Sequence, residues 1–340
     1  GRIVVHPTNP EIIYVAALGH AWGPNAERGL YKTTDGGKTW QLAKFVSDKA
    51  GFIDVAMDPS NPDVLYASSY ERVRGPWFLK SGGPGSALWK STDAGAHWAQ
   101  LTGGGLPGGI KGRIGIAVAP SNPGVIYAQI EVLRDEERVA DAAVATKSTR
   151  AEMGTDHAGG VWRSSDKGVT WQFMSDHDVR PQYYTVLRVD PKNENVVYSV
   201  GRRFYRSEDG GKTFNVINGP GHGDYHAIWV DPRNSEHLMI GNDGGLDISR
   251  DRGRTWESVR GMPVGQFAGL SVDMQRPFYV YGGLQDNGNL AGPSAVRGDF
   301  IAADDWFNVG GGDGAYTASD PTGQEYVYSE GQRGVMHRIE

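Results

Sequence analysis

The sequence predicts an all-β fold, a β-propeller of about seven four-stranded antiparallel blades whose last blade is incomplete. Two repeated motifs support this: a strand pair joined by a Pro-containing turn, present seven times, and a second, Asp-containing turn present five times. Tandem copies of one supersecondary unit are typical of propellers and solenoids. The 340 residues include 49 glycines and 18 prolines, which fits many short strands joined by turns.

The first motif is an alternating apolar strand, a turn related to Asp-Pro-x-Asn-Pro, and a second strand that typically contains Tyr. Blade units therefore start near residues 1, 52, 113, 184, 225, 267 and 314 of a propeller that spans 1–340. The first unit begins in its first strand and the last ends within its third. Because propellers close by pairing strands from both ends, we expect a fragment of a longer chain with flanking blades.

The second motif is an Asp box, Ser/Thr-x-Asp-x-Gly-x-Thr-Trp, with the copies TTDGGKTW, STDAGAHW, SSDKGVTW, SEDGGKTF and SRDRGRTW. In such a turn the aspartate accepts backbone N–H bonds and the glycine tolerates positive φ. We therefore expect a structural role for the five aspartates, which are Asp35, Asp93, Asp166, Asp209 and Asp251.

Strand order predicts which end of the blades binds ligands. Successive strands A to D are antiparallel, so the A–B turns and Asp boxes share one end and the B–C and D–A loops share the other. The B–C connections vary most in length, with long ones at 20–29, 69–86 and 131–160. The insertion at 131–160 is charged and Ala-rich, which favours a flexible segment or a short helix over a binding surface.

Composition excludes several classes of function. A net charge of −6 without a concentrated Lys/Arg tract argues against a nucleic-acid partner. The absence of cysteine excludes disulfides and thiol chemistry. No apolar stretch approaches the roughly 20 residues of a transmembrane helix, and no signal peptide is readable. Metal-binding spacings of His and Cys are also absent.

With both motifs, the chain resembles the BNR/Asp-box superfamily, which includes sortilin-type receptors and tandem-propeller xyloglucan hydrolases. The segments HPTNPEIIYVAALGHAWGPN, GLQDNG and WFNVGGGDGAY resemble large exported bacterial proteins labelled glycosyl hydrolases or sortilin-like. The resemblance implies a secreted or periplasmic protein with additional blades. Sialidases share Asp boxes, but their Phe/Tyr-Arg-Ile-Pro motif does not occur here.

Three aspartates are candidate catalytic residues. The sixth unit carries GLQDNG, with Gln285, Asp286 and Asn287, whereas Asp243 lies in GNDGGL and Asp313 in GGGDG. The similar xyloglucan hydrolases use two aspartates in Asp-Gly-Gly contexts, which nominates Asp243 and Asp286, with Asp313 in reserve. The alternative is that all three cap glycine-rich turns. Structural calcium on these loops is a further possibility; no other cofactor is expected.

Other candidate ligand-binding residues lie on the same predicted face. The loop GPGHGDYHA contributes His222, Asp224 and His226, although a buried histidine bonded to a neighbouring loop is the alternative reading of His226. Aromatic residues of the B–C loops could stack on sugars or pack between blades. They are Trp22, Tyr70, Trp77 and Phe78, and Tyr183 and Tyr184 present the same choice.

Two kinds of function remain open. The first is a propeller that binds or hydrolyses a polysaccharide with two aspartates. The second is a sortilin-like module that binds peptides or proteins without catalysis, or a structural scaffold subunit. Propellers serve all these roles, so the fold alone does not decide between them.

Overall fold

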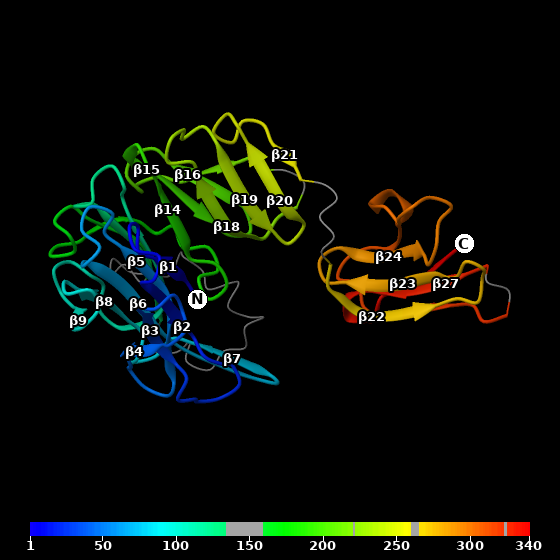
Figure 1. Cartoon of the computed structure of the whole chain (residues 1–340), viewed down its shortest axis with the longest axis horizontal. Coiled ribbons are helices and arrows are strands. Elements are labelled where there is room, and N and C mark those ends of the chain that lie inside the picture. Colours follow the sequence, from blue (N-terminus) through cyan, green and yellow to red (C-terminus); the bar gives the residue numbers. More distant parts are fainter. Residues whose placement is uncertain (134–158, 220–221, 260–264, 323–324) are drawn as a thin grey trace. The chain divides into compact units, whose positions relative to one another are not determined.

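The computed structural model describes residues 1–133, 159–219, 222–259, 265–322 and 325–340. Its described residues form seven antiparallel sheets that follow one another along the chain (Figure 1). Six sheets have four blade strands in the order A-B-C-D, and the seventh has three. This confirms the predicted propeller of about seven blades with an incomplete last unit.

The first three sheets contain the N-terminal strands. The first is β1 (Ile3–Val5), β2 (Ile13–Ala17), β3 (Gly29–Thr33) and β4 (Gln41–Lys44). The second is β5 (Ala50–Met57), β6 (Leu65–Gly75), β8 (Ala87–Ser91) and β9 (Ala99–Leu101), with β7 (Phe78–Ser81) paired to β6. The third is β10 (Ile110–Val118), β11 (Ile126–Leu133), β12 (Gly160–Ser164) and β13 (Gln172–Ser175).

The remaining sheets repeat this order. The fourth is β14 (Val186–Asp190), β15 (Asn193–Val200), β16 (Phe204–Ser207) and β17 (Asn215–Ile217), and the fifth is β18 (Tyr225–Val230), β19 (Leu238–Asn242), β20 (Gly245–Ser249) and β21 (Glu257–Ser258). The sixth is β22 (Phe267–Val272), β23 (Tyr279–Leu284), β24 (Gly288–Pro293) and β25 (Phe307–Gly310). The seventh is β26 (Thr317–Ser319), β27 (Val327–Glu330) and β28 (Met336–Ile339).

The chain divides into two compact units. The first unit comprises residues 1–219, 223–240 and 249–256, and the second comprises 220–222, 241–248 and 257–340. The boundary passes through the fifth sheet. Each unit is described by itself below.

Apolar clusters join successive sheets in the first unit. One cluster combines Tyr14 and Leu30 of the first sheet with Phe52 and Leu65 of the second. Equivalent clusters lie between the second and third, third and fourth, and fourth and fifth sheets. Because a single sheet cannot bury both of its faces, each blade depends on its neighbours for its core.

In the first two blades, a tyrosine of strand B also links the blade to the Asp box of the following blade. The Tyr14 hydroxyl donates to the Ala94 carbonyl at 2.8 Å, and the Tyr66 hydroxyl donates to the Lys167 carbonyl at 3.0 Å. The strand-C residues Lys32 and Lys90 donate their Nζ groups to the same two carbonyls. We call this paired contact the tyrosine clamp.

The Asp boxes share one set of hydrogen bonds. In the first box, Asp35 accepts bonds from the Thr33 hydroxyl, the Thr39 amide and the Thr39 hydroxyl, at 2.7, 2.9 and 2.6 Å. The boxes of Asp166, Asp209 and Asp251 repeat this arrangement with Ser and Thr partners, and Asp93 uses Ser91 and His97. The carboxylate therefore holds both ends of the turn.

The segment 69–86, expected as a long loop, is largely strand. β6 continues to Gly75, and the chain turns at Pro76–Trp77 and returns as β7. The prediction missed this hairpin because residues 70–75 alternate in polarity only weakly.

The insertion predicted at 131–160 begins with the last residues of β11 and ends with the first residue of β12. Its residues 134–158 lie outside the described residues.

We expect Tyr66→Phe to lower the free energy of unfolding by about 1 kcal/mol, because a buried hydroxyl loses its bond to the next blade. Tyr198→Phe is the matched control: Tyr198 is equally buried, but its hydroxyl has no hydrogen-bond partner among the described residues. That change should be neutral or stabilising. Urea denaturation measures both, and equal effects of the two changes would contradict the clamp.

We further expect an acid-dependent loss of stability from the Asp boxes. Bonds from the Thr39 hydroxyl and amide lower the pKa of Asp35 from 3.8 to about 2, and Asp166 and Asp251 behave alike with Thr170 and Thr255. Because the folded pKa lies below the ordinary value, this stabilisation is complete above about pH 4 and is lost as the pH falls toward 2.

Urea denaturation between pH 5 and pH 2.5 tests this expectation. Asp35→Asn should flatten the pH dependence of the unfolding free energy, whereas Asp63→Asn, at an exposed position of an A–B turn, should leave it unchanged. Parallel curves for wild type and Asp35→Asn would refute the assignment.

Candidate functional site

In the second unit, hydrogen bonds join two turns at the end of the blades where the B–C and D–A loops emerge. Asp286 lies in the turn between β23 and β24, and Asp313 lies in the loop between β25 and β26. The Asp313 carboxylate accepts the Asp286 amide at 2.8 Å. Main-chain bonds from Gly288 to Gly312 and from Gly314 to Leu284 reinforce the contact.

A third turn joins the same group. Asp243 lies between β19 and β20, and its carbonyl accepts a bond from the Asn287 side-chain amide at 2.9 Å. That amide also donates to the Gln285 carbonyl, and the His222 ring bonds the Asp286 carbonyl at 3.0 Å. The structure thus brings together Asp243, Asp286 and Asp313 with Gln285, Asn287 and His222. We call this group the triple-turn site.

The local backbone explains why these residue types occur there. Asp286 has φ 61° and Gly288 has φ 74°, a left-handed conformation that aspartate and glycine adopt more readily than branched residues. Beneath the Asp243 turn, buried Asp247 accepts bonds from Asn242 and Ser258 at 2.6 and 2.5 Å. The turns are therefore held from below by side-chain hydrogen bonds.

The three candidate aspartates differ in their hydrogen bonding. One carboxylate oxygen of Asp313 accepts a hydrogen bond from the Asp286 amide. This is the turn-capping role that was the alternative to catalysis in the sequence analysis. The main-chain carbonyl of Asp243 and the main-chain amide and carbonyl of Asp286 form hydrogen bonds that join the turns, and all three residues are half-buried. A pair of half-buried carboxylates on rigid turns can exchange protons with a bound ligand.

Asp224 and His226 belong to the first unit, whereas the residues of the triple-turn site belong to the second. Asp224 has φ 57°, and its carboxylate accepts a bond from the Tyr184 hydroxyl. The His226 ring lies 5.4 Å from the ring of buried Tyr184, yet His226 is exposed. The alternative of a buried histidine at position 226 is therefore wrong, because β18 turns this side chain outward.

The aromatic candidates divide between surface and core. Trp22 and Trp77 are 60% and 79% exposed, and Phe78 and Tyr183 are also exposed. The Arg74 guanidinium lies 5.8 Å from the Trp22 ring centre, and the Arg74 amide donates to the Ala21 carbonyl at 2.8 Å. Loop 20–29 therefore contacts the β6–β7 hairpin.

Tyr70 was expected among the exposed aromatics, and this placement is wrong. It is fully buried in β6, where its hydroxyl bonds Ser81 Oγ at 2.7 Å. The extension of β6 past the predicted strand end causes the difference, since alternation along the strand points Tyr70 inward.

Sequence reasoning missed two buried acids of the first unit. Glu71 and Glu131 are 4% and 7% exposed and lie within β6 and β11, the B strands of successive blades. Glu71 accepts the Lys80 Nζ at 2.6 Å, whereas Glu131 accepts the Ser81 hydroxyl and the Arg113 amide at 2.9 and 2.7 Å. The available signal was an acid in the second half of two successive B strands, in SSYE and AQIE.

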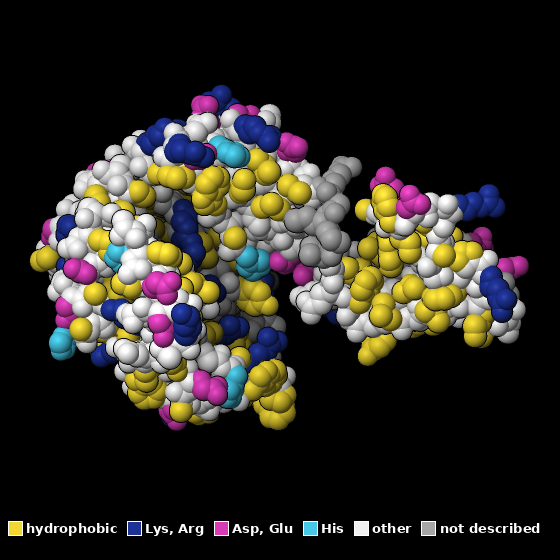
Figure 2. All heavy atoms as spheres, in the orientation of Figure 1, with side chains coloured by type: hydrophobic (Ala, Val, Ile, Leu, Met, Phe, Trp, Pro, Cys, Tyr) yellow, Lys and Arg dark blue, Asp and Glu magenta, His cyan; other side chains and the backbone are white. Residues whose placement is uncertain are grey.

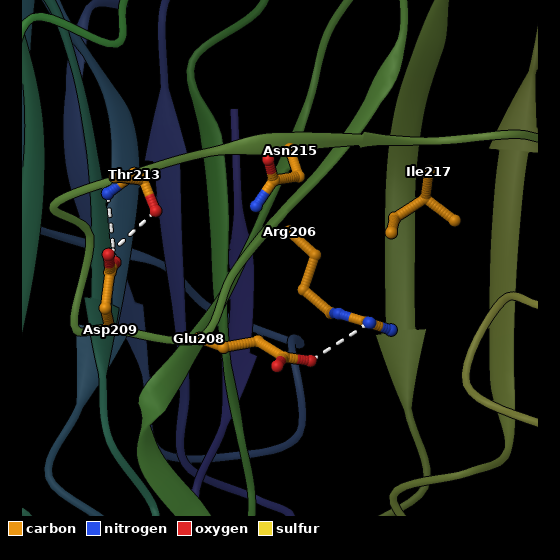
Figure 3. Close-up of a pocket in the computed structure, with 6 residues that line it drawn as sticks. All are labelled: Arg206, Glu208, Asp209, Thr213, Asn215 and Ile217. Atoms are coloured by element: carbon orange, nitrogen blue, oxygen red, sulfur yellow. Dashed lines mark hydrogen bonds and ion pairs between the residues drawn. The ribbon is translucent and has the colours of Figure 1, made fainter.

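A surface pocket of about 230 Å³ lies in the fourth sheet, lined by Arg206, Glu208, Asp209, Thr213, Asn215 and Ile217 (Figure 3). Its charged groups bond one another: Arg206 pairs with Glu208 at 3.0 Å, and Asp209 accepts the Asp-box bonds of Thr213. The pocket is thus built from Asp-box residues, and its acids already have donors.

Within the part of the chain that the structure describes, no group of three or more His, Cys, Asp or Glu residues is arranged to hold a metal ion. The expected alternative of structural calcium stays a prediction. No helix in the described ranges is long and apolar enough to cross a membrane.

The chain is similar in sequence and fold to known propeller enzymes. The BNR/Asp-box repeat model matches residues 31–42. The xyloglucanase Xgh74A of Acetivibrio thermocellus is 24% identical over 329 residues, covering 81% of this chain and 34% of that enzyme. A xyloglucanase of Hypocrea jecorina is 25% identical over 275 residues, covering 77% and 26%.

Among solved structures, an ancestral GH74 enzyme aligns with a TM-score of 0.50 at 20% identity, over 99% of this chain and 44% of that one. The chain spans about a third or less of the length of these curated relatives. It is a BNR-repeat β-propeller related to glycoside hydrolases.

We expect Asp313→Ala to lower the free energy of unfolding by about 1 kcal/mol, because the Asp286 amide loses its acceptor while the main-chain bonds between the two turns remain. Asp299→Ala, at an exposed position of the same unit, is the control and should change little. Chemical denaturation followed by circular dichroism would measure the difference. An unchanged midpoint for Asp313→Ala would show that this hydrogen bond does not stabilise the turns.

Proposed function

We propose that this glycoside-hydrolase-related propeller binds and hydrolyses a polysaccharide of the xyloglucan type at the triple-turn site. One observation carries the proposal: three turns that are distant in sequence are hydrogen-bonded into a single group, and each presents a half-buried aspartate. The similarity to xyloglucanases over 81% of the chain supports the choice of substrate.

The chemistry assigned to the site is acid–base catalysis by Asp243 and Asp286. One carboxyl group protonates the oxygen of the leaving sugar, and the other activates water or attacks the sugar carbon. Asp313 is a positioning residue, since its carboxylate holds the amide of Asp286. His222 fixes the same residue through its carbonyl.

In the first unit, taken by itself, Trp22 and Trp77 are assigned as sugar-binding residues, because flat exposed rings stack on the faces of pyranose sugars. A polymer of this kind lies outside the cytoplasm, so we place the parent protein in the secreted or periplasmic fraction.

The second candidate function is a sortilin-like module that binds a peptide or protein and catalyses nothing. The hydrogen bond that the Asp313 carboxylate accepts from a backbone amide favours it, because the same group of turns then needs its acids only for structure. The two functions differ in one measurable respect, which is the cleavage of a bound polysaccharide.

We expect Asp243→Asn and Asp286→Asn each to lower xyloglucan hydrolysis by about a hundredfold to ten-thousandfold, as for loss of a general acid or base. Both variants should still bind xyloglucan, since an amide preserves the shape of the side chain. Release of reducing ends measures hydrolysis, and affinity electrophoresis measures binding, both on the full-length protein.

Asp63→Asn is the control with the same change of charge, at an exposed position in an A–B turn. Unchanged hydrolysis in both site variants would remove Asp243 and Asp286 from the mechanism. Binding of xyloglucan without cleavage by the wild type would support a non-catalytic module, and absence of both would exclude xyloglucan as the ligand.

A further inference from the structure

The sequence contains two Asn-Gly pairs, at 218–219 and 287–288. In such a pair the main-chain nitrogen of the glycine can attack the side-chain carbonyl carbon of the asparagine, because no Cβ crowds its approach. A new C–N bond forms, the side-chain nitrogen leaves as ammonia, and water then opens the cyclic imide to a carboxylate. Both pairs have this chemistry in common, so their surroundings in the fold decide which of them reacts.

Asn287 lies in the triple-turn site, where hydrogen bonds hold both reacting groups. Its Nδ2 donates to the carbonyls of Asp243 and Gln285 at 2.9 and 3.0 Å. The Gly288 amide, which would be the attacking group, donates to the Gly312 carbonyl at 2.9 Å. The reaction therefore requires these bonds to break first.

The residue before Asn287 is held as well. The Asp286 amide donates to the Asp313 carboxylate at 2.8 Å, and the Asp286 carbonyl is bonded by the His222 ring at 3.0 Å. Gly288, on the other side, is buried. Attack thus needs a local opening of the joined turns, and such openings are rare where the main chain is buried and hydrogen-bonded.

The other pair has different surroundings. Asn218 follows β17 in the D–A loop of the fourth blade, within the first unit, and its side chain is exposed. Its carbonyl accepts a bond from Trp256 Nε1 at 3.0 Å. Within the described ranges, neither the Asn218 side-chain amide nor the Gly219 main-chain amide has a hydrogen-bond partner. Both reacting groups are therefore available in the folded state.

Packing explains why a glycine stands at position 219 despite this reactivity. A Cβ on Gly219 would lie 2.1 Å from the hydroxyl oxygen of Tyr225, which is buried in β18. A larger residue would displace that tyrosine from the cluster between the fourth and fifth blades. The fold thus requires the residue that makes Asn218 reactive.

We propose that Asn218 is a site of spontaneous deamidation in the folded protein, and that the joined turns protect Asn287 from the same reaction. Conversion of Asn287 to aspartate would replace the donor of two hydrogen bonds with an acceptor. The bonds that assemble the triple-turn site therefore also preserve the asparagine that joins its turns. This inference does not rest on the proposed polysaccharide function.

Deamidation changes the charge of the protein as well as its mass. The chain carries a net charge of −6, and acidic and basic side chains are interspersed on the visible face of the first unit (Figure 2). Each event replaces a neutral amide with a carboxylate and adds one negative charge. Anion-exchange chromatography therefore separates the modified protein from the unmodified one.

The experiment incubates the full-length protein at pH 8, once folded and once unfolded in guanidinium chloride, and follows both asparagines by peptide mass spectrometry. In the folded protein we expect Asn218 to react about tenfold to a hundredfold faster than Asn287, the factor that corresponds to breaking a few hydrogen bonds. In guanidinium chloride the two rates should be similar, because neither pair is then held by the fold.

Two substitutions assign the effects to these residues. Asn218→Gln should remove the fast reaction and its chromatographic peak, because the longer side chain forms the ring less readily. Asp313→Ala should speed the reaction at Asn287 and leave that at Asn218 unchanged, because the joined turns lose one bond. Asp299→Ala, at an exposed position of the second unit, is the control and should change neither rate. Circular dichroism establishes that the sheets of each variant are intact.

Equal rates at Asn218 and Asn287 in the folded protein would overturn the inference. So would an unmodified Asn218 after a time in which the unfolded chain reacts. An unchanged rate at Asn287 in Asp313→Ala would overturn the assignment of its protection to the joined turns. None of these readouts involves xyloglucan, so the inference and the proposed function can fail independently.

Discussion

The contact on which the first unit most depends is the tyrosine clamp between one blade and the Asp box of the next. The hydroxyls of Tyr14 and Tyr66 reach the carbonyls of Ala94 and Lys167, which have φ values of 54° and 59°. The clamp requires the left-handed turn, and the aspartate in that turn requires its Ser or Thr partners. The first and second blades are thus hydrogen-bonded to the Asp box of the following blade, in addition to sharing an apolar core with it.

Because the Asp boxes and A–B turns hold the blades together at one end, the loops at the opposite end can vary in length and sequence. The A–B turns and Asp boxes use their acids to hold the chain, and the low pKa values of Asp35, Asp93, Asp166 and Asp251, about 2, reflect that use. At the B–C and D–A end the acids are placed differently. In the triple-turn site the Asp313 carboxylate accepts the main-chain amide of another turn, whereas buried Glu71 and Glu131 of the first unit accept bonds from Lys80 and Ser81.

The repeat pattern was sufficient to predict the number of blades and the end at which each loop emerges. It also placed Asp243, Asp286 and Asp313 at one end, because antiparallel strand order determines this without knowledge of contacts. It did not distinguish Asp313, whose carboxylate caps the Asp286 amide, from the other two. Nor did it predict the orientation of Tyr70 or His226, which depends on where β6 and β18 begin and end.

The sequence by itself determined the all-β repeat architecture and the family resemblance, since both follow from local turn chemistry and from the alternation of residues along strands. Only the tertiary structure decided which polar groups meet. The frame of Tyr70, Ser81, Glu131 and Arg113 joins residues up to 61 positions apart, including an Oγ-to-carboxylate bond across 50 positions. Such contacts depend on how neighbouring blades pack, and packing between blades leaves no periodic signal in a single sequence.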